Sequence, residues 1–399
     1  MLSPQSTAAA TQTAVQTAMI NVKSGQTLLF TAGTYQFTDQ LSLSVAGVTM
    51  KGASKDTVIL DFSQQGNGGG NGIFVTAGDF IIDGFTIKDT KGDAVRVQGT
   101  DPQHLVKNVT MRNTKVFWSA GSVPDNPGYA LYPTTAENVL IENNEVHNAS
   151  DACLYVGQSK NIMIRNNVVS ECENGIEVEN STGAEVMNNT VTNNVGGILV
   201  FNLPNLPVKI GSMTVVHDNI VMGNNHAKFP ADPEGTGALT PPGTGMVIFS
   251  ADQTEMRNNM VMGNSSTAVL VISCPTAALV SGNASYCNDP GYNSYMKGAY
   301  IHDNTFQANG TDPLDIYAVF KNAQGHLEEI IWDGQVDPAD PDPYGDNKLC
   351  IKNNGDDTFV QSDPQGIATG GAVRISTDLA PHDCTHPAVP SINVTWGME

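Results

Sequence analysis

An asparagine pair recurs at a nearly constant spacing through the middle of the chain. The second member of the pair lies at Asn144, Asn167 and Asn189, in steps of 23 and 22 residues. The same signature returns after longer steps at Asn219, Asn259 and Asn304. A period of about 20 to 25 residues that repeats several times is typical of a solenoid, in which each repeat contacts only its neighbours. The pair therefore predicts a stack of coils.

Each repeat contains three short runs of alternating aliphatic residues, such as CLYVG, NIMIRN and NVVSE. Runs of this kind, bounded by Asn, Gly and Ser, indicate strands, and no helical period is present. Three strands per coil of about 22 residues predict an all-β fold, a single-stranded parallel β-helix with coils roughly 4.8 Å apart. Asn fits the corners because it tolerates the left-handed conformation and forms hydrogen-bonded ladders. A β-sandwich with Asn-rich turns is the alternative, but it would not keep the pair in register.

Composition limits the partners of the chain. The net charge of −21 makes nucleic acid and anionic membrane surfaces poor partners. It also disfavours an acidic polysaccharide unless cations or a local basic patch intervene. No apolar run approaches the roughly 18 residues of a membrane span. The start, MLSPQSTAAATQ, lacks the basic and apolar regions of a signal peptide and is typical of a chain whose leader has been removed.

Six cysteines are spaced so that three local pairs are expected, 153–172, 274–287 and 350–384. The second pair brackets one loop and is the strongest of the three. An even count with local pairing indicates an oxidising compartment, and hence a secreted, extracellular or periplasmic protein. Buried free thiols are the alternative for Cys153 and Cys172, which lie in or beside strands.

Three regions are expected along the chain. Residues 1–45 contain a helix at 5–18, which would cover the open end of the core, and a first coil. Residues 46–310 form the β-helix, with insertions at 226–244 and 274–298 that would wall a binding face. Residues 311–399 lose the period and are interpreted as a cap; their Asp-rich run 333–346 is either a solvated loop or a calcium-binding segment.

One outward-facing column carries the candidate site. Aligning the coils places Leu131, Leu154 and Ile176 inward, so the alternate residues of the same strands face outward. Stacked tyrosines suit sugar rings and can transfer protons, and an arginine could neutralise an acidic sugar. We therefore predict catalytic roles for Tyr155, Tyr132 and Arg96. Substrate contacts are predicted at Tyr129, Gln98, Thr134 and Gln158. The alternative is an ordinary solvated sheet.

Two further features of the column lead to predictions. Glu177 and Glu179 alternate on one strand, so their carboxylates point the same way and either bind a cation such as Ca²⁺ or repel each other. His147, at a strand end, is interpreted as a turn residue and not as a base. On later coils the column becomes apolar, and we expect the two insertions and part of the tail to cover it, or else a second copy in a homodimer. The apolar residues are Leu199, Phe201, Val247, Phe249, Leu270 and Ile272.

The stretch 129–201 resembles the right-handed parallel β-helix superfamily of carbohydrate-active proteins, with its pectate-lyase-like enzymes, alginate lyases, mannuronan C5-epimerases and NosD-like proteins. Tyr129-Ala-Leu-Tyr132-Pro-Thr134 stands where the epimerases have a "YG-x-DPH" motif, with Tyr132 and Thr134 at their Asp and His positions. Glu177 and Glu179 resemble the calcium-binding pair of the alginate and chondroitin lyase family, whose following Lys is replaced here by Ser181 and Thr182. The resemblance implies a right-handed coil and polysaccharide chemistry.

Two functions remain open from the sequence. One is an extracellular polysaccharide lyase or epimerase that acts on a uronic-acid polymer by abstracting a proton next to a carboxylate. The other is a non-catalytic secreted or surface protein that binds glycan or a protein partner through the same face.

Overall fold

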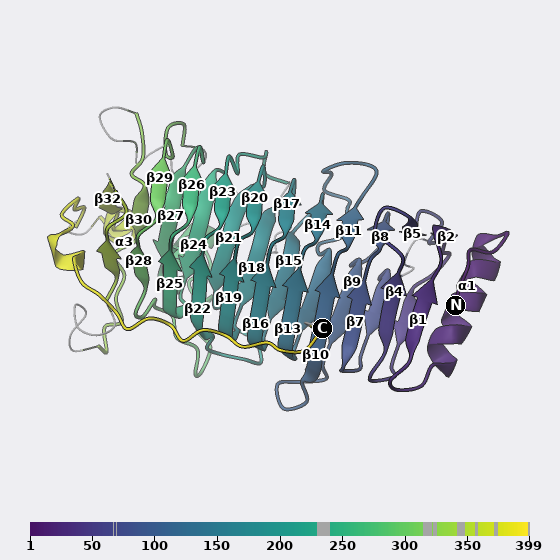
Figure 1. The fold of residues 1–399 in the computed structure, drawn as a ribbon. Coiled ribbons are helices and arrows are strands. Elements are labelled where there is room, and N and C mark those ends of the chain that lie inside the picture. The colour runs from purple at the N-terminus through teal and green to yellow at the C-terminus, as the bar shows by residue number, and fades with distance from the viewer. Residues whose placement is uncertain are drawn as a thin grey trace. The chain divides into compact units, whose positions relative to one another are not determined.

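The computed structural model describes residues 1–66, 68, 70–229, 240–313, 321, 325–340, 348–355, 358–370 and 374–397. The chain forms two compact units. Unit 1 contains Met1–Cys172 and Ile392–Glu399, and unit 2 contains Glu173–Ser391. Both are built from coils of three short strands (Figure 1).

Unit 1 contains three parallel sheets, named A, B and C, and every third strand along the chain joins the same sheet. Sheet A contains β1 (Thr27–Phe30), β4 (Thr49–Gly52), β7 (Phe80–Asp83), β10 (Val106–Arg112), β13 (Ala136–Glu142) and β16 (Lys160–Arg165). Sheet B contains β2 (Gly33–Gln36), β5 (Val58–Asp61), β8 (Thr86–Lys88), β11 (Lys115–Phe117), β14 (Glu145–His147) and β17 (Val168–Ser170). Sheet C contains β3 (Leu41–Leu43), β6 (Ile73–Val75), β9 (Val95–Gln98), β12 (Leu131–Thr134) and β15 (Ala152–Gly157).

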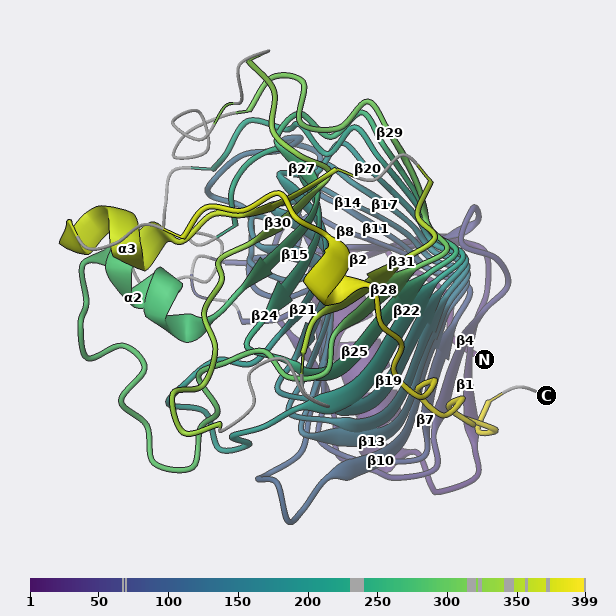
Figure 2. The same ribbon diagram turned by 90° about the vertical axis from the view of Figure 1, so that its left-hand side faces the viewer.

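Unit 2 repeats this arrangement, and its three sheets form the three faces of each coil (Figure 2). Sheet A contains β19 (Thr182–Met187), β22 (Ser212–His217), β25 (Asp252–Arg257), β28 (Tyr300–His302) and β31 (Cys350–Lys352). Sheet B contains β20 (Thr190–Thr192), β23 (Ile220–Met222), β26 (Met260–Met262) and β29 (Thr305–Gln307). Sheet C contains β18 (Asn174–Glu179), β21 (Gly196–Phe201), β24 (Thr244–Phe249), β27 (Thr267–Ile272), β30 (Ile330–Trp332) and β32 (Phe359–Gln361).

The core of each unit is a set of aliphatic stacks. Leu131 pairs with Leu154 in unit 1, and Ile176 pairs with Ile198 in unit 2; all four side chains are fully buried. Burying an aliphatic side chain contributes roughly 1.5–3 kcal/mol, so the repeated stacks supply most of the driving force for each coil. The predicted all-β parallel β-helix is confirmed.

The two members of the asparagine pair have different roles. The first member takes the left-handed conformation at the corner, with φ of 56° at both Asn143 and Asn166. The second is buried and joins a ladder: the side-chain nitrogen of Asn144 donates to the Asn167 side-chain oxygen at 3.0 Å. In unit 2 the same bond links Asn219 to its successor in the next coil. Because buried amides need partners, each rung fixes the register of the next.

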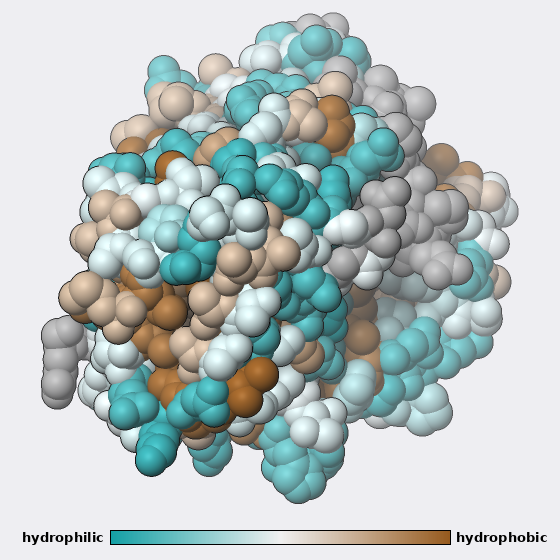
Figure 3. Space-filling model, turned by 90° about the vertical axis from the view of Figure 1, so that its right-hand side faces the viewer, coloured by the Kyte–Doolittle hydropathy of each residue, from teal (hydrophilic) through white to brown (hydrophobic). Residues whose placement is uncertain are grey.

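Helix α1 (Ala8–Asn21) packs on β2 and β3 at the start of unit 1. Its bounds lie three residues after the predicted helix because the Thr7 side chain accepts from Ala10 N–H and caps it. The side chain of Gln12 donates to the Gln40 carbonyl just before β3, and that of Gln16 donates to the Ser42 carbonyl within it, so they satisfy part of its open edge. Figure 3 looks onto this end, where hydrophobic patches alternate with polar ones.

The sheets of unit 2 continue beyond residue 310, where the sequence period is lost. Strands β30, β31 and β32 pair with β27, β28 and β30, respectively. Helices α2 (Cys274–Ser281) and α3 (Pro364–Thr369) lie next to each other outside sheet C (Figure 2). A 3₁₀ helix, η3 (Ala380–His382), follows. The C-terminal region is thus partly an extension of the coils and partly a cover.

Candidate functional site

The predicted column lies on the outer face of sheet C in unit 1. Strands β9 and β12 pair so that Arg96 is opposite Tyr132 and Gln98 is opposite Thr134. Thr134 in turn is opposite Gly157 of β15. The same register places Tyr132, two residues before Thr134, beside Tyr155, which is two residues before Gly157. Alternate side chains of a strand share a face, so the three predicted catalytic residues form one row.

Four side chains make up what we call the tyrosine–arginine cluster: Arg96, Tyr129, Tyr132 and Tyr155. The ring centroid of Tyr132 lies 4.4 Å from that of Tyr129 and 4.6 Å from that of Tyr155. The ring centroids of Tyr129 and Tyr155 are 4.9 Å apart. The Arg96 guanidinium carbon lies 4.7 Å from the Tyr132 ring centroid. Such a cation over an aromatic face is attracted by the ring quadrupole.

The loop before β12 holds Tyr129 in this cluster. The side-chain nitrogen of Asn126 donates to the backbone oxygen of Asn148 at 2.6 Å, and Ser150 Oγ donates to the Asn126 carbonyl. The backbone N–H of Asp151 donates to the Gly128 carbonyl at 3.0 Å. Each bond ties the loop to the next coil. The position of Tyr129 is therefore fixed by the coil that carries Tyr155.

Arg96 is fixed by two hydrogen bonds. Its Nε donates to the Gln98 side chain at 3.0 Å, and its Nη1 donates to Asp93 at 3.3 Å. Burial raises the pKa of the Asp93 carboxyl, against the opposing effect of the Arg96 charge. Sequence reasoning missed Asp93. The signal was an acidic residue three positions before Arg96, just before the start of the same strand.

The structure corrects the expected exposure of several predicted residues. Tyr155 is only 4% exposed, and its ring lies over Gly157, where a side chain would collide with it. Thr134 is buried, and its hydroxyl is satisfied by donating to the Gly157 carbonyl at 3.2 Å. Gln158 is a corner residue with φ of 53°, partly exposed after β15. The accessible members of the cluster are Arg96, Tyr129 and Tyr132, each partly exposed.

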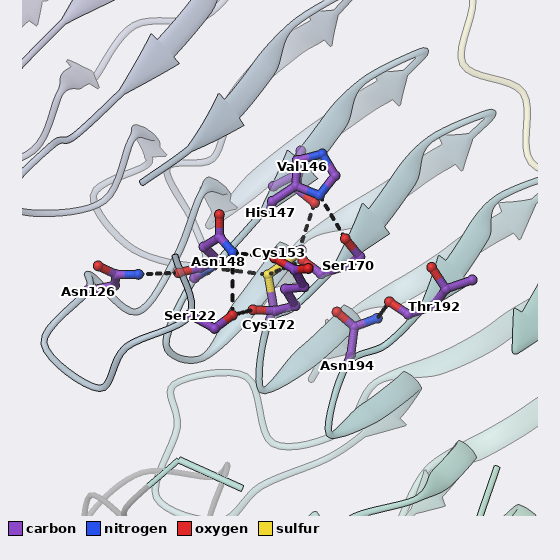
Figure 4. Close-up of a disulfide and its surroundings, with 12 residues drawn as sticks. Ser122, Asn126, Val146, His147, Asn148, Cys153, Ser170, Cys172, Thr192 and Asn194 are labelled. Carbon is purple, nitrogen blue, oxygen red and sulfur yellow. Dashed lines mark hydrogen bonds between the residues drawn. A yellow bond between two sulfur atoms is a disulfide. The ribbon is translucent and has the colours of Figure 1, made fainter. Parts of the chain in front are cut away.

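Figure 4 shows the surroundings of the Cys153–Cys172 disulfide, which lies in the same unit. His147 is engaged there by Ser170 Oγ at 2.7 Å and by Glu145 at 3.3 Å. His147 thus belongs to sheet B, on another face of the coil from the cluster.

All three predicted cysteine pairs are confirmed as disulfides, so the free-thiol alternative is wrong.

Glu177 and Glu179 lie on β18 of unit 2. They were expected to be open to solvent, but they are buried, at 0% and 6% exposure. The Asn174 amide donates to Glu177 at 2.6 Å. Burial and, less strongly, the negative charge of Glu179 raise the pKa of the Tyr286 hydroxyl. Within the described ranges, no group of three or more His, Cys, Asp or Glu side chains is placed to hold a metal ion. Calcium at this pair stays a prediction.

The apolar half of the column is covered from within unit 2, as one alternative predicted. Its residues pack with Cys274, Ala277, Tyr286 and Tyr292 of the second insertion, and with Leu327 and Ile331 of the tail region. Asp289 holds this insertion by accepting from Lys209 at 2.8 Å. Of the first insertion, 226–244, residues 230–239 lie outside the described residues. The cover removes the reason for expecting a second copy at this strip.

The sequence matches the family described as "Right handed beta helix region" at residues 46–209 and 122–285. Because these matches together span more than half of the chain, the protein belongs to this family. The resemblance predicted from the repeat is confirmed. A comparison with curated proteins finds no match.

Solved structures are similar to this chain at low sequence identity. The A-module of mannuronan C-5 epimerase AlgE4 from Azotobacter vinelandii has a TM-score of 0.51 and 16% identity, with 87% of this chain and 90% of that chain covered. An alginate lyase from Paenibacillus sp. str. FPU-7 has a TM-score of 0.48 and 12% identity, with coverages of 76% and 97%. No helix of the described residues is long and apolar enough to cross a membrane.

Proposed function

We propose that this protein processes a uronate-containing polysaccharide outside the cell, at the tyrosine–arginine cluster of unit 1. The observation that carries the proposal is the fixed position of Arg96, whose guanidinium is held by Asp93 and Gln98 against the Tyr132 ring. A guanidinium matches a sugar carboxylate in charge and planar geometry. The adjacent tyrosines supply an aromatic surface for the sugar ring and hydroxyls for proton transfer.

The chemistry follows from these groups. Pairing of the uronate carboxylate with Arg96 stabilises the negative charge that develops when the proton at C5 leaves. Tyr132 is the proposed base: its phenolate takes this proton and becomes neutral. The electron pair then has two possible fates. It either expels the C4 oxygen, which takes a proton from water and leaves a C4=C5 double bond, or it accepts a proton from water at C5 on the opposite face of the ring. The first outcome is elimination and the second is epimerisation.

Two further observations support the class and the location. The fold is shared with a chain named as a mannuronan epimerase, which is an argument by fold analogy. Three disulfides favour an extracellular protein. Calcium is assigned no step, because Ca²⁺ takes six to eight oxygen ligands and, within the described residues, no group of three or more His, Cys, Asp or Glu side chains is placed to hold a metal ion.

The second candidate is a non-catalytic glycan-binding protein. The observation that favours it is the burial of Tyr155, whose ring lies over Gly157 of its own strand, which leaves fewer hydroxyls for proton transfer. In this case the same cluster binds the polymer by ring stacking and by the Arg96 charge.

The experiment that tests the proposal measures the ultraviolet absorbance of unsaturated uronate ends, with a panel of polyuronates, with calcium or with a chelator. A lyase gives rising absorbance, which Tyr132→Phe and Arg96→Gln abolish while Lys91→Gln, an exposed basic residue outside the cluster, does not. Retained turnover in both cluster variants would contradict the proposed site. A loss on chelation alone would show that a metal neutralises the carboxylate in place of Arg96. Binding without any chemical change would support the second candidate.

A further inference from the structure

Unit 2 contains a cavity of about 850 Å³ outside sheet C, away from β18. Its floor is formed by outward residues of the last sheet C strands, including Leu270, Ile331 and Val360. Its walls are the facing sides of α2 and α3, which lie side by side in Figure 2. Small-molecule sites typically have volumes of about 300–1,000 Å³ and mostly apolar linings, and this cavity fits both criteria.

The rim of the cavity carries large aliphatic side chains that are exposed to solvent. Val280 on α2, Ile367 on α3 and Ile375 after α3 are 49%, 45% and 56% exposed. All three line the cavity. The apolar surface therefore continues from the floor to the mouth. Leaving such a concave patch in water is unfavourable, so an apolar molecule that filled it would be stabilised by the removal of this surface from water.

One carboxylate gives the cavity a polar end. Asp333 lines it and is buried. Its Oδ2 accepts from the Ser273 N–H at 2.7 Å and from the Thr276 hydroxyl at 2.6 Å, and its Oδ1 accepts from the Gln335 N–H at 3.1 Å. Burial raises the pKa of this carboxyl to about 6. The other charged or titratable residues of the lining are Lys321, His326 and Glu328. Among the described residues, the hydrogen-bond partners of Asp333 do not include any of these three. A buried carboxylate without a basic partner favours a hydrogen-bond donor and disfavours an anion.

We infer that this cavity binds a small amphiphile, an apolar chain or ring that ends in a hydroxyl or amine group directed at Asp333. The concave, mostly apolar lining and the buried polar end favour a small molecule over a second copy of the chain, which would need a broad accessible face. The site is separate from the tyrosine–arginine cluster, so it does not depend on the proposed polysaccharide chemistry.

Binding of the uncharged fluorescent probe N-phenyl-1-naphthylamine to the full chain tests this inference. We expect one probe per chain, displaced by dodecan-1-ol and dodecylamine but far less by dodecanoate, at a pH well above 6, where Asp333 is ionised. Ala368→Trp, which fills the mouth from the exposed side of α3, should weaken probe binding by about tenfold or more. Thr369→Trp, on the same helix but outside the lining, is the matched control and should leave binding unchanged.

Asp333→Asn tests the polar end. It should remove the discrimination against dodecanoate while the probe still binds; thermal unfolding of each variant checks that the fold is kept. The inference is overturned if the probe does not bind the parent protein, or if Ala368→Trp binds it as tightly as Thr369→Trp. Preferred displacement by dodecanoate would overturn the assigned head group. A dimer in light scattering that Ala368→Trp converts to a monomer would show that the cavity is an interface between copies.

Discussion

Gly157 decides how Tyr155 lies in the column. An added Cβ at this position would collide with the hydroxyl and ring carbons of Tyr155, so only glycine leaves room for the ring to fold back over its strand. This contact orders the last ring of the tyrosine–arginine cluster, and through it the neighbouring rings of Tyr129 and Tyr132.

Gly157→Ala should therefore lower the free energy of unfolding by about 1–3 kcal/mol, because the Tyr155 ring must leave its position. Gly66→Ala is the control, since no atom lies within 4 Å of an added Cβ there, and its stability should stay near that of the parent. Chemical denaturation of both variants gives the comparison. Equal stability would show that the ring has another place to go.

Glu145 on β14 gives a pH-dependent contribution in unit 1. Despite burial, which raises it, the pKa of this carboxyl is lowered from 4.5 to about 2 by hydrogen bonds from Lys115, His147 and Lys55. A carboxyl with a lowered folded-state pKa stabilises the protein above its unfolded value and loses that contribution as pH falls through the folded value.

The stability difference between the parent and Glu145→Gln should thus be largest above pH 4.5 and shrink as the pH approaches 2. Denaturation curves across this range measure it. A difference that stays constant with pH would mean that the carboxylate is not the group responsible.

At the scale of single residues, the sequence predicted which residues share a face but not the conformations of their side chains. Strand alternation was enough to group Arg96, Tyr132 and Tyr155 in one row. It could not show that Tyr155 folds over Gly157, because rotamers depend on the neighbouring coil. Asp93 was missed since it precedes its strand, where alternation no longer assigns a direction.

At the scale of elements, the cover over the apolar strip is the main feature of unit 2. The sequence predicted it because six large apolar side chains on an outward column need burial. The disulfide Cys274–Cys287 ties α2 to the loop that follows, and Tyr292 donates its hydroxyl hydrogen to the Asn202 carbonyl at 2.8 Å. The helical form of the cover was not predicted, because eight residues are too few for a clear helical period.

Phe249→Asp should destabilise a monomeric protein by about 3–5 kcal/mol, because it places a charge in this buried cluster and leaves a cavity. Gln253→Asp, an exposed residue in the next strand, should change stability little. Light scattering and thermal unfolding distinguish the outcomes. A stable Phe249→Asp variant that shifts from dimer to monomer would contradict the intramolecular cover.

At the scale of the molecule, the coil period predicted the fold because each coil repeats one set of requirements: a buried aliphatic stack, a left-handed corner and an asparagine ladder. The prediction stopped at about residue 310 because the following strands are separated by segments of irregular length, which remove the period without removing the pairing. The function was less predictable, since the residues that carry it occur once and follow no repeat.

The most direct test of the proposed chemistry is proton NMR of a polyuronate panel incubated with the protein in D₂O. Abstraction of the C5 proton must leave a mark in either outcome: an olefinic signal after elimination, or deuterium at C5 after epimerisation. We expect one of these marks with the parent protein and with Lys91→Gln, and neither with Arg96→Gln or Tyr132→Phe. A polymer that binds the protein at Arg96 yet gains no olefinic signal and no deuterium would contradict the catalytic account.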